Sequence, residues 1–482
     1  MSNSNNKAIK AGIGYTVGNY LLKGLTFFTI PIFARLLNPS DYGLYNIFVA
    51  YESILFVVIG LAIHSSYKNA RYKYGIDIEA IHSNKSYYNY ISTTLVMLIL
   101  LGFGWLVSVN VFSAFLTEEL GLNLLSLNLL VLFSFGSAVI TCFNVDASLQ
   151  YKYQSFLKVA GINAIGNLIL SILLINTVFD ENRYMGRVVG STIPLVVLAV
   201  FIIYSFMKQA KPGNYKEFLS WGVRYSLPIV PHGISQIILS QFGRVMINNM
   251  VNSSAAGIFS FAYNIYNILW VTANSLDNVW TTWFYEKMHQ KEYTSIKEKS
   301  SLYMIFMLVF SVTVMLISPE LIKFLGTKAY DDAIYCVIPI IAGGYFAFLY
   351  TIPAGVEYFY EKSQYIALGT MLAAVVNIGL NYVCINKYGY VSVAYITLIT
   401  YLIYFFFHYI LAWKIHGEVL FDNRVVISCT VLMILTMCMA RFFIDCVYIR
   451  WFTAILIFVL GLLYEENQLG LIKRFVDRKG NN

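Results

Sequence analysis

Long apolar runs recur along the whole chain, and they constrain the fold more than any other feature of the sequence. An apolar run of about 18 residues or more is typical of a membrane-spanning helix. Hydrophobic residues make up 58% of the 482 residues, whereas charged residues make up only 12%. Because a backbone in hydrocarbon must satisfy its own hydrogen bonds, only helices or a closed barrel can cross a membrane. The runs are too long and too uniformly apolar for barrel strands, so the sequence predicts an all-α polytopic membrane protein.

The apolar runs also predict the number of spans. We expect about fourteen, centred near residues 24, 55, 99, 132, 167, 196, 235, 268, 309, 344, 376, 401, 434 and 455. Twelve spans followed by a surface hairpin is the alternative for the last two runs. No loop between the runs is long enough for a folded domain outside the membrane.

The distribution of Lys and Arg between loops predicts the orientation. Loops on the side of the N-terminus carry 22 of these cations, whereas loops on the other side carry 8, Arg187 among them. Cytoplasmic loops carry the excess of positive charge. We therefore expect both termini in the cytoplasm. The same bias accounts for the net charge of +8, so no nucleic-acid partner is needed to explain it.

Two segments repeat at one ungapped offset of 214 residues. In the first, Asn38, Ser40 and Gly43 correspond to Asn252, Ser254 and Gly257. In the second, far downstream, the matched residues are Gln150, Tyr151, Ala160, Asn163 and Asn167 with Gln364, Tyr365, Ala374, Asn377 and Asn381. Self-similarity at a fixed offset is typical of duplicated structural units.

The repeat predicts the domain organisation. We expect a six-helix lobe at 1–212, a second at 213–416, and two extra helices with a cytoplasmic tail at 417–482. Six spans are an even number, so the lobes have the same orientation and are related by a pseudo-two-fold axis along the membrane normal. Transporters of this kind hold substrate between their lobes near mid-membrane.

The first repeated segment has the residues of a helix start. Asn38 is suited to cap the second span, and Pro39 to the first helical position, where a missing N–H costs little. Asp41 then lies near the positive end of the helix dipole. We expect a capped turn between spans 1 and 2, and its repeat at Asn252 before span 8.

The segment "GYTVGNYLLKGLTFFTIPIFARLLNPSDYGLYNIFVAYESIL" resembles the opening of bacterial polysaccharide exporters of the oligosaccharide flippase type. These belong to the multidrug and oligosaccharidyl-lipid exporter superfamily, and the resemblance is strongest over residues 10–75. It implies a flippase in the bacterial inner membrane that moves undecaprenyl-diphosphate-linked oligosaccharide repeat units from the inner to the outer leaflet for O-antigen or capsule-type polysaccharide. Fourteen spans resemble the peptidoglycan-precursor flippases, whose last two helices help to house the lipid tail.

Cations within the spans are candidates for binding a diphosphate. Charged side chains inside a membrane are costly and are therefore functional candidates by default. Arg binds phosphate bidentately, whereas Lys acts as a point charge. We expect Lys23 in span 1 and Arg244 in span 7 to bind the diphosphate, with Arg224 as a third candidate near the cytoplasmic end of span 7.

Glu52 and Lys23 leave two interpretations open. The pair joins spans 1 and 2 as a structural ion pair, or both residues face the substrate cavity, with Glu52 as counter-ion or proton carrier. Asn19 lies four residues before Lys23, on the same helical face.

Span 7 carries a polar stripe below Pro228 and Pro231, two prolines that we expect to kink the helix. The stripe has a spacing of four residues and consists of His232, Gln236, Ser240 and Arg244. We expect it to line the cavity and to bind sugar or a coupling ion.

The repeated asparagine pairs also have two interpretations. Asn163 and Asn167 in span 5, and Asn377 and Asn381 in span 11, either bind sugar hydroxyls or form hydrogen bonds between helices. Membrane helices commonly use Asn for such packing bonds.

Other functions are less consistent with the sequence. A drug or small-cation antiporter of the same superfamily needs acidic residues in its cavity, whereas span 7 offers Arg and His. A glycosyltransferase or polymerase needs a large outer loop, and none is present. The sequence contains no P-loop motif, so it gives no indication that ATP drives transport directly. The six cysteines include no CxxC pair and therefore do not indicate a metal site. We expect no cofactor, a lipid-linked oligosaccharide as substrate, contact with membrane lipid, and a polymerase and other polysaccharide-assembly proteins as partners.

Overall fold

Within the part of the chain that it describes, the computed structural model contains helices and no strand. The described residues are 14, 18, 21, 22, 24, 27–75 and 85–469. They form two compact units, unit 1 up to Gly257 and unit 2 from Ile258. These units follow from spatial proximity rather than from the repeat, so the lobes at 1–212 and 213–416 and the segment at 417–482 stay predictions.

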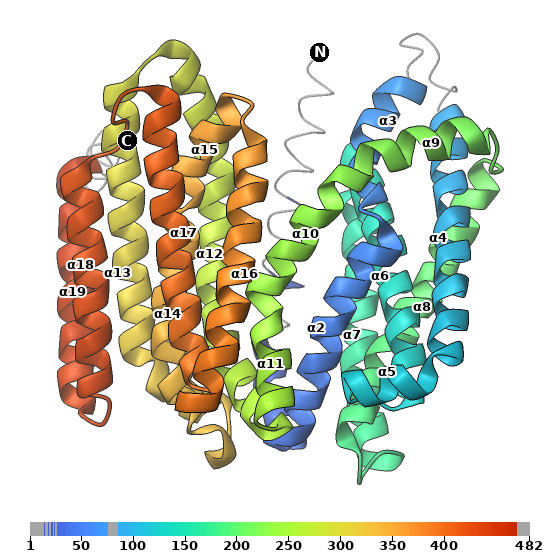
Figure 1. Cartoon of the computed structure of the whole chain (residues 1–482), viewed down its shortest axis with the longest axis horizontal. Coiled ribbons are helices and arrows are strands. Elements are labelled where there is room, and N and C mark those ends of the chain that lie inside the picture. Colours follow the sequence, from blue (N-terminus) through green and yellow to red (C-terminus); the bar gives the residue numbers. More distant parts are fainter. Residues whose placement is uncertain are drawn as a thin grey trace, which may run out of the picture. The chain divides into compact units, whose positions relative to one another are not determined.

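Unit 1 begins with an apolar helix at Phe27–Leu36. The elements that follow are α2 (Pro39–Gly60), η1 (Ile63–Ser66), α3 (Tyr67–Tyr74), α4 (Lys85–Val111), α5 (Ser113–Leu120), α6 (Leu124–Leu149), α7 (Tyr153–Thr177), α8 (Arg183–Gln209), α9 (Tyr215–Ser226), η2 (Leu227–Ile229), α10 (Val230–Ile237), η3 (Ile238–Phe242) and α11 (Gly243–Met250). Helix α9 runs across one end of the unit beside α3 and α4, and α10 and α11 then return alongside α2 (Figure 1).

Helix α12 (Ser253–Gln290) starts in unit 1 and continues into unit 2. The remaining elements of unit 2 are α13 (Tyr293–Leu325), η4 (Lys328–Tyr330), α14 (Ala333–Leu349), α15 (Thr351–Phe359), α16 (Ser363–Tyr388), α17 (Ser392–His416), α18 (Asn423–Phe442) and α19 (Val447–Leu469). Helices α18 and α19 lie at the edge of this unit, and each packs on α13 (Figure 1).

Eleven helical segments of the described chain are long and apolar enough to cross a membrane. The prediction of a polytopic all-helical membrane protein is therefore confirmed. Both C-terminal helices, α18 and α19, are among the eleven, which favours two spans over a surface hairpin. The count of fourteen stays a prediction, because the first expected span is described only in part, the seventh is broken into short pieces, and the eighth is the 38-residue α12.

The repeated turns cap their helices as the sequence predicts. The Asn38 side chain accepts a hydrogen bond from the backbone N–H of Asp41 at 2.9 Å, with Pro39 directly after the cap. The Asn252 side chain accepts one from the N–H of Ala255 at 2.8 Å. Each bond satisfies a backbone donor that a helix start otherwise leaves without a partner.

The two repeated turns also contact each other, within unit 1. A Cβ atom on Gly43 would lie 1.9 Å from the carbonyl oxygen of Ser253, and one on Gly257 would lie 1.8 Å from that of Pro39. At the repeat offset of 214 residues, Gly43 corresponds to Gly257 and Pro39 to Ser253, so the two contacts are reciprocal. Ser40 and Ser253 join the same crossing through their hydroxyl groups, 2.6 Å apart. Glycine is required at both positions because no side chain fits between the backbones.

An ion pair between a buried arginine and a partly exposed glutamate attaches the last helix to the rest of unit 2. Arg450 on α19 is 2% exposed, and its guanidinium donates to both carboxylate oxygens of Glu320 on α13, at 2.7 and 2.8 Å. Nη1 also donates to the carbonyl of Leu316 at 2.6 Å. This bidentate geometry offsets the desolvation of the cation.

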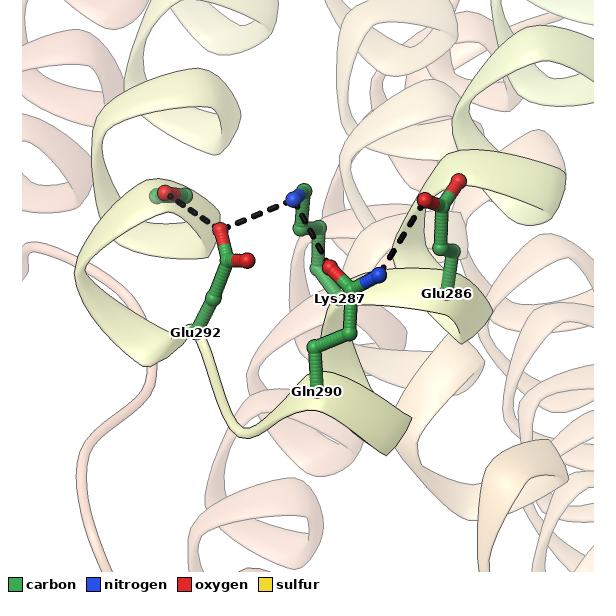
Figure 2. A network of polar contacts seen from close by, with 5 residues as sticks. Glu286, Lys287, Gln290 and Glu292 are labelled. Carbon is green, nitrogen blue, oxygen red and sulfur yellow. Dashed lines mark hydrogen bonds and ion pairs between the residues drawn. The ribbon is translucent and has the colours of Figure 1, made fainter.

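The loop between α12 and α13 holds an exposed polar network (Figure 2). Lys287 donates to Glu292 and to Gln290, each at 2.8 Å, and Gln290 donates to Glu286 at 3.3 Å. The hydrogen bond from Lys287 lowers the pKa of the Glu292 carboxyl group. These contacts fix the turn at which α12 reverses into α13, outside the apolar part of both helices.

The glycine crossing predicts the outcome of two matched substitutions. Gly43→Ala places a methyl group against the Ser253 carbonyl, so the backbones must separate, at a cost of about 1–3 kcal/mol. Gly104→Ala in α4 meets no atom within 4 Å and is expected to leave stability unchanged or slightly higher. Thermal unfolding of the purified protein in detergent measures both. A Gly43→Ala protein that unfolds at the same temperature as wild type would contradict the close crossing.

The Arg450–Glu320 pair predicts a double-variant pattern. Arg450→Met leaves the Glu320 carboxylate without its partner. Because the Glu320 side chain is 32% exposed and solvent screens its charge, we expect a loss of about 1–2 kcal/mol in unfolding free energy. The double variant Arg450→Met, Glu320→Met removes both charges and is expected to recover most of that loss. Arg441→Met serves as control, since this cation is exposed and stacks on the Tyr335 ring. Equal losses in the single and double variants would contradict a paired, buried charge.

Candidate functional site

Helices α7 and α8 approach closely because α8 presents two glycines to α7. A Cβ atom on Gly190 would lie 2.5 Å from the Cα of Ser171, and one on Gly186 would lie 2.9 Å from the backbone nitrogen of Ile175. Small residues spaced by four let membrane helices pack backbone to backbone. Polar side chains on the facing surfaces of α7 and α8, Asn167 and Arg187 among them, are therefore held close to one another.

Arg187 lies at the centre of this packing. Its Nη1 atom donates to the Asn167 side-chain oxygen at 2.6 Å and to the Ser171 hydroxyl at 3.1 Å. Its guanidinium carbon lies 3.5 Å from the ring centre of Phe33 and 4.9 Å from that of Tyr45. We call these five residues the Arg187 cluster. Four helical segments of unit 1 contribute to it: the helix at Phe27–Leu36, α2, α7 and α8.

The Arg187 cluster retains a positive charge. Asn167, Ser171 and the two aromatic rings are neutral, and no carboxylate of the described chain forms an ion pair with Arg187. Ring faces stabilise a cation by about 0.5–2 kcal/mol, and hydrogen bonds to a charged donor add about 1.5–3 kcal/mol. These contacts hold the guanidinium in place without cancelling its charge, so the cluster is suited to bind an anion.

The sequence pattern alone did not single out Arg187. From the sequence we assigned Arg187 to the cations of the outer loops, whereas the structure places it in the second turn of α8. The flanking glycines of "GRVVG" were the available signal, because they indicate a helix face in close contact with a neighbour.

Span 7 is broken, as its prolines predict. A 3₁₀ turn, η2, contains Pro228, and Pro231 lies in the first turn of α10. Farther on, the π-helical turn η3 separates α10 from α11. A π-turn disturbs the 3.6-residue period, so residues on its two sides do not continue one straight stripe.

The expected stripe is therefore divided between α10, η3 and α11. His232 and Gln236 lie on α10, and the buried Nδ1 atom of His232 makes no hydrogen bond to the described chain. The Ser240 hydroxyl, in η3, donates back to the carbonyls of Gln236 and Ile237 at 3.0 and 3.3 Å. Whether His232, Gln236 and Ser240 bind sugar or an ion stays a prediction.

The other candidate charges of unit 1 lie on separate elements. Arg244 is buried on α11, 8% exposed, whereas Arg224 lies exposed in the last turn of α9. Glu52 is buried on α2, which packs against α10 and α11. Lys23 and Asn19 lie outside the described residues, and so does the expected contact between Lys23 and Glu52.

Unit 2 uses its repeated asparagines in a neutral network. Asn381 is fully buried and donates to Asn377 at 2.9 Å, and Asn377 donates to the Thr400 hydroxyl on α17 at 3.2 Å. These bonds join α16 to α17, which is the packing role expected for Asn in a membrane helix. Among the corresponding residues of unit 1, Asn167 binds Arg187, and the Oδ1 atom of Asn163 is buried without a partner in the described chain.

Unit 2 also contains an acid–base pair that the sequence did not indicate. Glu357 on α15 and His408 on α17 are both 0% exposed and form a hydrogen bond between Oε1 and Nδ1. The Tyr404 ring packs edge-on against the imidazole, with 4.5 Å between ring centres. Both residues lie inside apolar runs, and sequence alone could not show that α15 and α17 bring them together.

Comparison with protein families gives one match. The pattern of a family described as "Polysaccharide biosynthesis protein" matches residues 9–284, more than half of the chain. That range includes every residue of the Arg187 cluster. Comparison with curated proteins gives no match.

Comparison with solved structures shows the fold. The lipid II flippase MurJ, in an inward closed conformation, superposes with a TM-score of 0.73 at 15% identity, covering 95% of this chain and 99% of that one. An inward-facing multidrug resistance MATE family transporter of the MOP superfamily gives 0.63 at 13% identity, covering 82% and 95%. The chain therefore shares its fold with a flippase and with multidrug transporters.

The Glu357–His408 pair predicts the effect of removing one partner. His408→Leu leaves a fully buried carboxyl group without its hydrogen bond, and we expect a loss of about 3 kcal/mol in unfolding free energy. Glu357→Gln keeps an acceptor for His408 and is expected to lose clearly less. Thermal unfolding in detergent compares the two proteins. A His408→Leu protein as stable as wild type contradicts a buried pair.

Proposed function

The chain belongs to the polysaccharide biosynthesis protein family, and we propose that it is a flippase for lipid-linked oligosaccharide. In this proposal it moves undecaprenyl-diphosphate-linked repeat units from the inner to the outer leaflet of a bacterial cytoplasmic membrane, for O-antigen or capsule-type polysaccharide. The family description and the fold shared with the lipid II flippase MurJ support the substrate class. Both termini lie in the cytoplasm, and a polymerase receives the unit at the outer face.

Beside the family match and the shared fold, the observation within the structure that best supports the proposal is the cation at the Arg187 cluster. A diphosphate group must leave water to cross the membrane, and an unpaired ion costs several kcal/mol, roughly, in such surroundings. A guanidinium held by aromatic and amide groups supplies a counter-charge without a carboxylate that competes with the substrate. A carrier of cationic drugs needs the opposite sign of charge.

The substrate crosses by alternating access. Lys23 and Arg244 bind the diphosphate, and Arg224 guides it from the cytoplasmic end of span 7. Glu52, Asn19, His232, Gln236 and Ser240 contact sugar or a coupling ion. An inside-negative potential favours outward movement of an anion by about 2.3 kcal/mol per charge per 100 mV.

A drug or small-cation antiporter is the second candidate function. Two observations favour it: the shared fold with multidrug MATE transporters, and carboxyl groups buried within the helices at Glu52 and Glu357. Drug efflux from cells that express the protein, with normal surface glycan after gene deletion, would select this function over the flippase.

The flippase proposal predicts the phenotype of two charge substitutions. Lys23→Ala and Arg244→Ala each remove a diphosphate-binding cation, so we expect surface polysaccharide to fall at least about 10-fold. Quantitative immunoblotting of membranes controls for loss of protein, and Arg244→Lys tests whether charge alone suffices. Arg441→Ala is the matched control, because its cation is exposed and stacks on Tyr335. Normal polymer in both alanine variants contradicts the assignment of Lys23 and Arg244.

A further inference from the structure

We propose that the Arg187 cluster is an anion-binding site within unit 1, which takes the phosphate or diphosphate group of the transported substrate. The inference rests on the proposed function and assigns a subsite to it. The site consists of Arg187 with its hydrogen-bond partners Asn167 and Ser171, and of Phe33 and Tyr45, whose rings lie against the guanidinium.

The hydrogen bonds of Arg187 leave one edge of the guanidinium unused. Both bonds to α7 come from Nη1. Nε and Nη2 make no hydrogen bond to the described chain, and neither is among the buried atoms without a partner. These two atoms form a planar donor edge that matches two oxygens of a phosphate group.

The surroundings of Arg187 fix the guanidinium before any ligand arrives. The Phe33 and Tyr45 rings lie against it, and Asn167 and Ser171 hold Nη1 from α7. Ser171 also donates to Asn167 at 3.1 Å, so the two α7 side chains support each other. A preorganised donor loses little conformational entropy on binding, which raises affinity for an anion that fits.

Packing of α7 against α8 does not by itself require a cation. In unit 2, the residues at the offset of 214 from Asn167 and Arg187 are Asn381 and Tyr401. That helix pair, α16 and α17, is joined by the neutral bonds of Asn381, Asn377 and Thr400. Unit 1 therefore carries a charge at a position where its repeat packs without one, and a charge inside a membrane helix is costly to keep.

A structural role is the competing explanation. Arg187 contacts three neighbouring helical segments and could serve only to hold them together. The variant Asn167→Asp separates the two roles. It places a carboxylate where an oxygen already accepts from Nη1 at 2.6 Å, so it keeps or strengthens the contact while neutralising the charge.

The test measures binding by the full-length protein in lipid nanodiscs. The probe is undecaprenyl diphosphate, with undecaprenol as the uncharged control and inorganic diphosphate as competitor. We compare wild type, Arg187→Gln and Asn167→Asp. The matched control is Arg183→Gln, one helical turn earlier, where an exposed cation donates to the Leu36 carbonyl at 3.0 Å.

We expect Arg187→Gln and Asn167→Asp to weaken binding of undecaprenyl diphosphate at least about 10-fold, since each removes the net charge of a bidentate site. Arg183→Gln and the binding of undecaprenol should not change. Asn167→Asp should also unfold at the wild-type temperature or above. Loss of competition by inorganic diphosphate alone, with undecaprenyl diphosphate bound as by wild type, would assign the site to free diphosphate and would overturn the inference.

Two other results overturn the inference. One is equal binding of undecaprenyl diphosphate by wild type and Arg187→Gln, which leaves the proposed function standing. The other is an Asn167→Asp protein that binds as wild type does while Arg187→Gln unfolds, which assigns Arg187 to structure alone. If wild type binds undecaprenol and its diphosphate equally, the proposed function fails, and the inference fails with it.

Discussion

The cost of holding a charge among packed apolar helices shapes this protein more than any other constraint. A buried ion loses its hydration and needs a partner within the protein. Arg450 meets that requirement with the Glu320 carboxylate, and Glu357 meets it with the fully buried His408. Arg187 is different, because rings, an amide and a hydroxyl surround it but leave its charge in place.

Close helix contacts position these groups. Two glycines of α8 bring Arg187 beside Asn167 and Ser171, and the reciprocal crossing of Gly43 and Gly257 fixes the starts of α2 and α12. The broken span at η2 and η3 adds a second departure from regular helix geometry in unit 1. The close packing of α7 and α8 holds Arg187 in place. The breaks at η2 and η3 instead turn the polar residues of span 7 in more than one direction, whereas a straight helix would present them on one face.

The sequence predicted those features that depend on local chemistry. Apolar run lengths identified the membrane helices, Asn38 and Asn252 were identified as caps, and the prolines of span 7 predicted its kink, all confirmed by the structure. The family resemblance is also confirmed by the match over residues 9–284.

Features that depend on contacts between distant segments were missed. Arg187 was assigned to an outer loop, because no sequence pattern shows that Phe33 and Tyr45 lie against it. The same limit hid the Glu357–His408 pair, whose members are 51 residues apart. A π-turn such as η3 has no sequence signal of its own. The polar stripe of span 7 was therefore predicted with the spacing of a regular α-helix.

The central claim is that an uncompensated cation in unit 1 carries the anionic head group across the membrane. Transbilayer movement of an undecaprenyl-diphosphate-linked oligosaccharide in proteoliposomes tests it most directly, with equal amounts of wild-type, Arg187→Gln and Arg183→Gln protein. The account predicts movement by wild type and Arg183→Gln, and a rate at least about 10-fold lower for Arg187→Gln. Equal rates for wild type and Arg187→Gln would contradict it.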